Sequence, residues 1–406
     1  MTTTPLSAGH HLQLLQGGAD FFPSLVTAID AAVQEVRLET YIFCFDTSGE
    51  AVAAALERAA LRGVAVYLVM DGIGTPVVPA EWIKRFEQVG VRWHRFSPLG
   101  RWGLLIPVGW RRLHRKLCVV DAQVVFCGGI NILDDFFDPA FGSLESPRYD
   151  FAVRATGPLV AVAHRTMVQF WSRLQLTRQL ETLKFGGVRQ TWKDSALSVG
   201  HPDGSASGRA FNGHGGVNAA LVLRDNVRNR NRIERAYRKA IADARHEVLI
   251  ASAYFLPGGK LRRALIHAAR RGVRVRLLLQ GRYEYFMQYH GARPVFGVLL
   301  AAGVEIHEYS AGFLHAKVAV VDSRWATVGS SNLDPLSLLL AREANVVVED
   351  ASFARTLRAS LLNAMQTQGV QLDAQAYAQR PWRQRFLERL AFGVMRLALF
   401  LTGRCY

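Results

Sequence analysis

A pattern of histidine, lysine and aspartate occurs twice in this chain at the same spacing, and this repetition constrains the fold more than any other feature of the sequence. Each copy has a His, one other residue, a Lys, four other residues and an Asp, followed by a glycine-containing turn that ends in Asn. The first copy comprises His114, Lys116, Asp121 and Asn131, and the second comprises His315, Lys317, Asp322 and Asn332. Matched copies of this length indicate an internal duplication whose two motifs meet in one composite site.

The duplication extends beyond the motif. Residues 36–72 and 248–281 each have the pattern of a strand, a loop, a helix and a second strand, and both helices end at a glycine that a β-branched strand follows. Residues 91–97 match 304–310 in the same way, each ahead of its motif. We therefore predict an α/β fold, built as two similar α/β sandwich halves with the active site at their interface.

A segment of different composition joins the two halves. Residues 186–216 are rich in Gly, Ser, Asn and His and show little periodicity, which predicts a linker. The chain would then consist of a first domain at 1–185 and a second domain at 217–370. We expect the second domain to open with a strand at 219–224 and a basic helix at 229–244.

The motif itself has the pattern of a β-hairpin. We expect strands at 113–120 and 124–127 in the first copy, and at 314–321 and 325–328 in the second. Side chains alternate along a strand, so the His and the Lys of each copy share a face, while the Asp ends the strand and braces the turn. A lone His on such a strand is ordinarily packed in the core, but a duplicated His–Lys pair beside small-residue turns indicates catalysis.

The two motifs together form a site for an anion, because they bring together two imidazoles, two ammonium groups and two side-chain amides. A phosphodiester fits such a site best. The sequence has no carboxylate cluster and no Cys/His grouping, so we expect neither a metal nor another cofactor. One neutral His can attack phosphorus while the other, protonated, donates to the leaving oxygen, which gives a phosphohistidine. The Lys and Asn side chains would hold the non-bridging oxygens as charge builds.

Each catalytic His also needs a group that orients its second ring nitrogen. A carboxylate lies downstream of each motif, Asp150 after the first and Glu343 after the second, and both precede apolar strands. We expect these acids to be the orienting groups; an exposed acid at the start of a strand is the alternative for each.

The charge of the chain favours an anionic partner. The 406 residues include 49 Lys and Arg against 33 Asp and Glu, which gives a formal net charge of +16 at pH 7. Such a field concentrates polyanions near the surface, and nucleic acid and anionic lipid both qualify. Residues 1–22 lack a basic region followed by an apolar one, so we expect no signal peptide and no amino-terminal membrane anchor.

Both motifs, with their Gly-Gly-x-Asn and Gly-Ser-x-Asn turns, resemble the phospholipase D superfamily, and the likeness extends from about residue 10 to 370. The second half is more specific, because residues 223–226, 253–258, 314–317 and 329–337 are similar to bacterial cardiolipin synthases of the B subtype. That subtype lacks the paired amino-terminal membrane helices of the A subtype, as we expect of this chain. One departure is Gly129, where many relatives carry Ser.

The resemblance implies a duplicated phospholipase D-like fold and a phosphatidyl transfer that needs no metal. In this family the first-motif His is usually the nucleophile and the second is the acid and base, which assigns these roles to His114 and His315. The resemblance also implies phosphatidylglycerol as donor and acceptor, with cardiolipin and glycerol as products. The enzyme would be peripheral, at the cytoplasmic face of the bacterial cell membrane.

Two segments favour a membrane surface over nucleic acid. Residues 102–110 form an apolar run between arginines, which suits an acyl-chain or bilayer contact, although a loop packed in the interior fits equally well. Residues 380–404 interleave apolar side chains with arginines, as in an amphipathic helix on a surface of anionic phospholipids; a dimer-packing helix is the alternative. The aromatic residues lie mainly in strands and in these segments, so we expect no nucleic-acid partner.

Other reactions of the same motif stay open. A phospholipid hydrolase would use water at the last step, a transphosphatidylase could take phosphatidylethanolamine as donor, and a nonspecific nuclease could share every catalytic residue. A membrane-binding module without activity could share the basic surface, but the intact double motif argues against it. The sequence carries no prediction of oligomeric state.

Overall fold

The computed structural model describes residues 4–98, 111–185, 216–225, 229, 231–282, 286–334 and 341–401. In chain order the first half contains β1 (Ser7–Gln16), α1 (Gly17–Asp30), β2 (Glu35–Thr40), α2 (Thr47–Leu61), β3 (Ala65–Asp71), α3 (Ala80–Val89), β4 (Arg92–Phe96), β5 (Arg112–Leu113), β6 (Lys116–Val120), β7 (Val124–Gly128), β8 (Phe137–Asp138), β9 (Gly142–Ser143), β10 (Phe151–Thr156) and α4 (Leu159–Phe185). The second half contains β11 (Val217–Arg224), α5 (Arg232–Asp243), β12 (Glu247–Ser252), α6 (Gly259–Arg270), β13 (Arg274–Gln280), α7 (Phe286–Leu300), β14 (Glu305–Tyr309), β15 (Lys317–Val321), β16 (Trp325–Gly329), β17 (Ala341–Glu349), α9 (Ala351–Thr367), β18 (Gly369–Gln371), α10 (Ala374–Ala378) and α11 (Trp382–Leu401).

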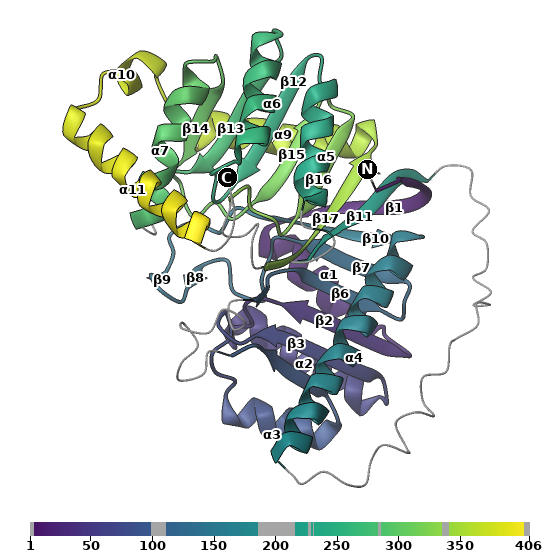
Figure 1. Ribbon diagram of the computed structural model, residues 1–406. Coiled ribbons are helices and arrows are strands. Elements are labelled where there is room, and N and C mark those ends of the chain that lie inside the picture. Colours follow the sequence, from purple (N-terminus) through teal and green to yellow (C-terminus); the bar gives the residue numbers. More distant parts are fainter. Residues whose placement is uncertain are drawn as a thin grey trace.

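Each half contributes the same arrangement of strands to one continuous sheet (Figure 1). The strand order is β10-β7-β6-β2-β3-β4 in the first half and β17-β16-β15-β12-β13-β14 in the second. The β2, β3 and β4 strands are parallel, as are β12, β13 and β14, and the two halves meet where β1 pairs with β11. The predicted duplicated α/β fold is confirmed.

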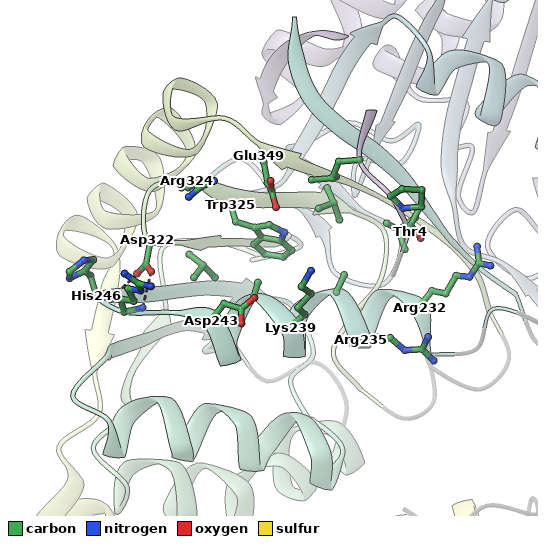
Figure 2. A pocket seen from close by; sticks show the side chains of 18 residues that line it. Thr4, Arg232, Arg235, Lys239, Asp243, His246, Asp322, Arg324, Trp325 and Glu349 are labelled. Atoms are coloured by element: carbon green, nitrogen blue, oxygen red, sulfur yellow. Dashed lines mark hydrogen bonds between the residues drawn. The ribbon is translucent and has the colours of Figure 1, made fainter. Parts of the chain in front are cut away.

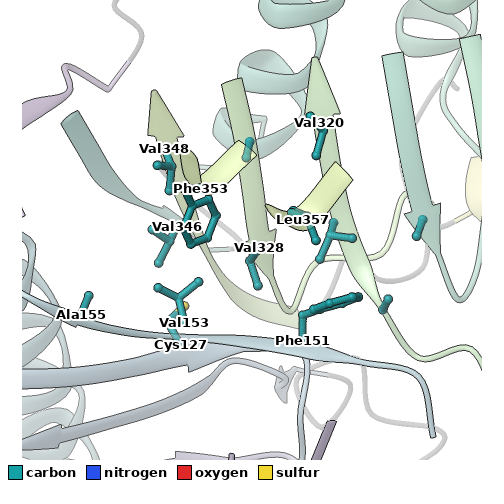
Figure 3. Packing of buried hydrophobic residues seen from close by; sticks show 14 of the residues in the cluster. Cys127, Phe151, Val153, Ala155, Val320, Val328, Val346, Val348, Phe353 and Leu357 are labelled. Atoms are coloured by element: carbon teal, nitrogen blue, oxygen red, sulfur yellow. The ribbon is translucent and has the colours of Figure 1, made fainter. Parts of the chain in front are cut away.

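The core of the molecule lies where the two halves meet. Its central cluster combines apolar side chains from strands of both halves with side chains from α4 and α9. Figure 3 shows Phe151 and Val153 of the first half opposite Val328 and Val346 of the second, with Phe353 of α9 beside Val346. Separate clusters cover the outer faces of the two halves. Because the central cluster is shared, neither half buries its inner sheet face alone.

The elements expected from the repeat are present in both halves. The strand–helix–strand pattern at 36–72 is β2, α2 and β3, and the one at 248–281 is β12, α6 and β13. Helix α2 begins after Asp46, whose carboxylate accepts a hydrogen bond from the Gly49 N–H at 2.9 Å, and it ends before Gly63 at a positive φ of 86°.

The expected first strands of the two hairpins are wrong in extent. The strand predicted at 113–120 divides into β5 and β6, and the one predicted at 314–321 begins only at β15. The reason is that the chain crosses to the other half before each motif: β5 pairs with β17, and Leu314 forms a bridge with Tyr149. Each His therefore lies at the interface, just ahead of the hairpin strand that carries its Lys.

Several predicted segments fall outside the described residues. Of the predicted linker at 186–216, only Gly216 is described. The apolar run at 102–110 lies entirely outside the described residues. The carboxyl-terminal segment predicted at 380–404 contains α11, which packs against α7 (Figure 1). Among the helices that the structure describes, none is long and apolar enough to cross a lipid bilayer.

Candidate active site

Each motif His is held by the backbone of the opposite half. The N–H of His114 donates to the carbonyl oxygen of Arg342 at 3.1 Å, and the N–H of His315 donates to the carbonyl oxygen of Tyr149 at 2.9 Å. These two contacts lie beside the junctions of β5 with β17 and of Leu314 with Tyr149. The duplication thus places both imidazoles at the interface between the halves.

The carboxylates that orient the two imidazoles are exchanged between the halves. The Nδ1 atom of His114 lies 3.0 Å from the carboxylate of Glu343, which belongs to β17. The Nδ1 atom of His315 lies 2.6 Å from the carboxylate of Asp150, which precedes β10. Both acids are buried, with 0% and 2% exposure, so the alternative of an ordinary surface acid is wrong for each. Each carboxylate lies downstream of one motif but contacts the His of the other.

The two motif lysines occupy equivalent positions at the start of β6 and β15. The Nζ of Lys116 donates to the carbonyl oxygen of His114 at 2.8 Å, and the Nζ of Lys317 donates to that of His315. Both lysines are buried, with 5% and 1% exposure. The ammonium groups are therefore held beside the imidazoles, where they offer N–H donors to an anion.

The two motif asparagines follow β7 and β16 and are also buried. The side-chain oxygen of Asn131 accepts a hydrogen bond from the Ile42 N–H at 3.1 Å. An amide fixed through its oxygen keeps its N–H donors available for a ligand. Asn332 has 2% exposure at the matching position of the second half.

The motif aspartates lie at the hairpin turns, at the other end of β6 and β15 from the lysines. The Asp121 carboxylate accepts hydrogen bonds from the backbone N–H groups of residues 33, 34 and 35 at 2.7–2.9 Å. The Asp322 carboxylate does the same for residues 245, 246 and 247 at 2.8 Å. Both aspartates have φ near +50° (50° and 51°), as a tight hairpin turn requires. This geometry makes them positioning residues that fix the hairpins, as the sequence pattern suggested, and places their carboxylates away from the imidazoles.

Burial and nearby cations keep both imidazoles neutral when no anion is bound. Burial lowers the pKa of His114 below 6.5, although the Glu343 charge opposes the shift. Burial lowers the pKa of His315 further, and the charges of Lys317 and Lys116 add to the effect. A neutral His with Nδ1–H directed to a carboxylate presents Nε2 as a nucleophile or base.

The two orienting carboxylates differ in their surroundings. Burial raises the pKa of Glu343, but the charge and hydrogen bond of His114 lower it more, so the net shift is downward. The hydroxyl of Ser330 also donates to Glu343. Asp150 packs against Gly129 instead, where a Cβ would lie 2.3 Å from its carboxylate oxygen, and burial raises its pKa to about 7. The departure at Gly129 thus makes room for Asp150.

Three further residues support the site, and the sequence analysis did not single them out. The ring of Tyr41 lies 5.0 Å from that of His114, and the Lys116 Nζ is 5.4 Å from the Tyr41 ring centre. The buried carboxylate of Asp71 accepts from the N–H of the residue before His114 at 2.7 Å. Arg148 adds positive charge near His315. Tyr41 and Asp71 follow or end adjacent parallel strands, which is the signal that could have identified them.

A cavity beside Asp322 of the second motif lies away from this chemistry. It has a volume of about 700 Å³, and Figure 2 shows it between α5 and the sheet, beside Asp322 and Trp325. None of the motif His, Lys or Asn side chains lines it. The described residues also contain no group of three or more His, Cys, Asp or Glu side chains placed to hold a metal ion.

Comparison with known proteins agrees with the duplicated site. A family model described as cardiolipin synthase, PLD-like domain, matches residues 25–140 and 237–365, so each matched stretch contains one motif. The chain is 37% identical over 398 residues to cardiolipin synthase B of Escherichia coli (strain K12), covering 97% of this chain and 90% of that protein. It is 28% identical over 386 residues to a cardiolipin synthase of Alkalihalophilus pseudofirmus, covering 95% of this chain and 71% of that protein.

A solved structure shares the fold over nearly the whole length. The phosphatidylserine synthase of Haemophilus influenzae Rd KW20 superimposes with a TM-score of 0.66 at 14% sequence identity, covering 97% of this chain and 95% of that one. At this identity the likeness concerns the fold alone. From the two family-model matches and the full-length similarity to the Escherichia coli protein, the chain belongs to the phospholipase D-like cardiolipin synthase family.

Proposed function

We propose that this protein is a phosphatidyltransferase that joins two phosphatidylglycerol molecules into cardiolipin and releases glycerol. The observation that carries the proposal is the pair of imidazoles, each bonded through Nδ1 to a buried carboxylate of the opposite half. Full-length similarity to proteins named cardiolipin synthase supports the choice of substrate. The chemistry needs one nucleophile, one proton carrier and donors for the phosphoryl oxygens, and the site has all three.

In the first half-reaction, Nε2 of His114 attacks the phosphorus of one phosphatidylglycerol. A nitrogen–phosphorus bond forms, the bond from phosphorus to the glycerol oxygen breaks, and His315, which has taken up a proton on Nε2, donates that proton to the departing oxygen. The phosphorylated imidazole of His114 keeps its Nδ1–H and so carries positive charge. Glu343 suits this intermediate, because its pKa is lowered and it stays ionised.

In the second half-reaction, His315 removes a proton from a glycerol hydroxyl of a second phosphatidylglycerol. That oxygen attacks phosphorus, the nitrogen–phosphorus bond breaks, and cardiolipin leaves with His114 neutral again. Lys116, Lys317, Asn131 and Asn332 hold the non-bridging oxygens in both steps.

Substrate binding itself prepares the acid. In the empty site the charges of Lys317 and Lys116 lower the pKa of His315, after the larger effect of burial. A phosphodiester between the two lysines offsets those charges, so the pKa of His315 rises when substrate binds. Protonation of the acid is thereby coupled to the arrival of the anion.

We also propose that the protein works as a peripheral enzyme on the cytoplasmic face of the bacterial membrane. Helix α11 carries apolar side chains at every fourth position that face outward, with 71% exposure at Trp382, 62% at Phe386 and 54% at Leu390. Exposed apolar residues beside arginines suit insertion into a surface of anionic phospholipids. No nucleic-acid partner is part of this proposal.

The test is a direct assay of products. Purified protein is mixed with phosphatidylglycerol vesicles, and cardiolipin and free glycerol are followed by mass spectrometry, with and without EDTA and beside an oligonucleotide cleavage assay. We expect equal amounts of cardiolipin and glycerol, no effect of EDTA and intact DNA. Phosphatidic acid instead of cardiolipin would identify a hydrolase, and cut oligonucleotides would identify a nuclease; either result alone would overturn the proposal.

A further inference from the structure

A groove of about 630 Å³ lies between α7, α10 and α11, apart from the active site. Small and apolar residues of α7 form much of it, among them Pro294, Gly297 and Val298. Five arginines from four places in the chain also line it: Arg270, Arg293, Arg380, Arg385 and Arg389. No motif residue lines the groove, so its positive charge is independent of the catalytic lysines.

Two of these arginines are paired with carboxylates. The Arg293 guanidinium pairs with Glu308 at 2.8 Å, and that of Arg380 pairs with Glu388 at 2.8 Å. Glu388 has 2% exposure, and Arg380 also stacks on the Tyr377 ring, 3.4 Å from its centre. The first pair joins α7 to β14, and Arg380 links Tyr377 of α10 to Glu388 of α11.

The other three arginines, Arg270, Arg385 and Arg389, take part in none of the ion pairs found among the described residues. Glu388 is the one carboxylate among the lining residues, and Arg380 and Gln384 already donate to it at 2.8 and 3.2 Å. Glu308 and Glu388 balance two of the five guanidinium groups, which leaves an excess of three positive charges along the groove. A groove with this balance attracts an anion, and the planar guanidinium fork matches phosphate.

The groove borders the exposed apolar side of α11. Arg385 and Arg389 each precede an exposed apolar residue, Phe386 and Leu390, by one position. Adjacent residues on a helix are about 100° apart, so the arginines follow the edge of the apolar stripe along the flank that faces α7. A lipid whose chains contact the stripe would bring its phosphate to these arginines.

We propose that the groove between α7, α10 and α11 binds the phosphate of an anionic phospholipid of the membrane surface, at a second site distinct from the catalytic one. The proposal rests on the proposed membrane location of the enzyme. The bound lipid is not consumed; it holds the protein on the anionic surface from which its substrate comes.

The test measures vesicle binding in a chain that cannot turn lipid over. Full-length His114→Ala protein is compared with the same protein carrying Arg385→Glu and Arg389→Glu, by co-sedimentation with phosphatidylcholine vesicles that contain phosphatidic acid. We expect the two charge reversals to weaken binding at least about tenfold, since each arginine near an anionic surface contributes substantially. Binding to pure phosphatidylcholine should stay unchanged.

A matched control carries Arg245→Glu and Arg324→Glu, the same charge change at exposed arginines outside the groove. We expect a loss of less than about threefold for this control, because screened charges far from the contact act weakly. If both double variants lost vesicle binding equally, net charge alone would explain the attraction. If neither variant lost binding, the groove would not be used. Either result overturns the proposal. The charge-reversed protein would also lose binding if it failed to fold, so a second variant, Arg385→Lys with Arg389→Lys, keeps both positive charges. We expect this variant to lose part of the vesicle binding, because lysine lacks the planar guanidinium group that matches phosphate.

Two further arms separate the remaining explanations. Because the groove is proposed to hold a phosphate, inorganic phosphate should release the protein from vesicles more than chloride does at equal ionic strength, and Arg385→Glu with Arg389→Glu should abolish this difference. Equal release of the parent protein by the two salts would contradict recognition of phosphate. Cardiolipin formation from detergent-dispersed phosphatidylglycerol is measured with His114 intact, and Arg385→Glu with Arg389→Glu should retain it. Absence of cardiolipin even in the parent chain would refute the proposed function, whereas the vesicle comparison addresses the groove alone.

Discussion

His114 and Glu343, 229 residues apart in the chain, form a pair across the interface, with Nδ1 of the imidazole 3.0 Å from the carboxylate. His315 and Asp150 form the reciprocal pair at 2.6 Å. Each half therefore supplies one imidazole and orients the imidazole of the other half. Separation of the halves breaks both pairs at once, so the catalytic arrangement exists only in the assembled chain.

Replacing Glu343 by Gln removes the charge that stabilises the phosphorylated ring of His114. We expect kcat to fall by about 10²- to 10⁴-fold, in the range found when an orienting carboxylate is neutralised, with a smaller change in KM. Steady-state cardiolipin formation measures both constants. Glu349→Gln is the matched control, because Glu349 ends the same strand but is exposed, and it should behave as the parent protein. A normal kcat in Glu343→Gln would exclude its orienting role.

The two histidines are expected to differ in covalent chemistry. His114→Ala should form no phosphatidyl adduct, whereas His315→Ala should still form one and release it slowly, because the proton carrier is lost. Acid-free quenching followed by peptide mass spectrometry detects the adduct. An adduct trapped on His315 in either protein would reverse the assigned roles.

Activity should decline above neutral pH through Lys116. Burial lowers the pKa of Lys116 from 10.5 to about 7, so the free enzyme loses this positive charge as the pH rises through about 7. Because kcat/KM reports the free enzyme, it should fall above that pH. Arginine stays charged, so Lys116→Arg should be slower at all pH values but lack this particular decline. An identical pH profile in the two proteins would contradict the assignment.

Asp322 should contribute stability that depends on pH. Burial tends to raise its pKa, but three backbone N–H groups outweigh burial, so the folded pKa is lower than 3.8. A depressed carboxylate pKa stabilises the fold above the unfolded value of 3.8, and this stabilisation is lost as the pH falls through the folded pKa. Asp322→Asn should therefore lower the free energy of unfolding by about 1–2 kcal/mol at pH 7 and by less near pH 3, which lies below the unfolded pKa. Chemical denaturation at both pH values measures the difference, and an equal difference at both would contradict it.

The exposed apolar side chains of α11 should matter more for binding to vesicles than for turnover of detergent-dispersed substrate. Changing Trp382, Phe386 and Leu390 to Ser should weaken vesicle co-sedimentation at least about tenfold, since each inserted apolar side chain contributes on the order of 1 kcal/mol or more. Turnover of detergent-dispersed substrate should change less. The matched control changes three exposed apolar residues of the first half to Ser, namely Val33, Leu61 and Val77. Equal sedimentation of the two triple variants would argue against membrane insertion by α11.

The repeat allowed much of the fold to be predicted, because local patterns determine each strand and helix. The strand–helix–strand units at 36–72 and 248–281 were correct, and so was the meeting of the two halves around one site. Alternation also indicated that the His and Lys of each motif act together, and each lysine Nζ donates a hydrogen bond to the backbone carbonyl oxygen of its motif His.

The exchange of carboxylates could not be predicted from spacing. Asp150 lies 36 residues after His114 (150 − 114) and Glu343 lies 28 residues after His315 (343 − 315), and the sequence contains nothing that says which His each one contacts. That choice depends on β5 pairing with β17 and on the bridge of Leu314 with Tyr149, both of which are long-range contacts. The same contacts divide the first expected strand, because the chain leaves its own hairpin before the His.

The pairing of β1 with β11 has a consequence for how the chain is made. Strand β1 is synthesised before both of its partners: it bonds to β10 on one side and to β11 on the other, and β11 begins only at Val217. Until that residue has been synthesised, β1 presents an open edge, which can recruit strands of other chains. We therefore expect a nascent or truncated first half to be inactive and prone to aggregate, since its His114 lacks Glu343 until β17 has been made.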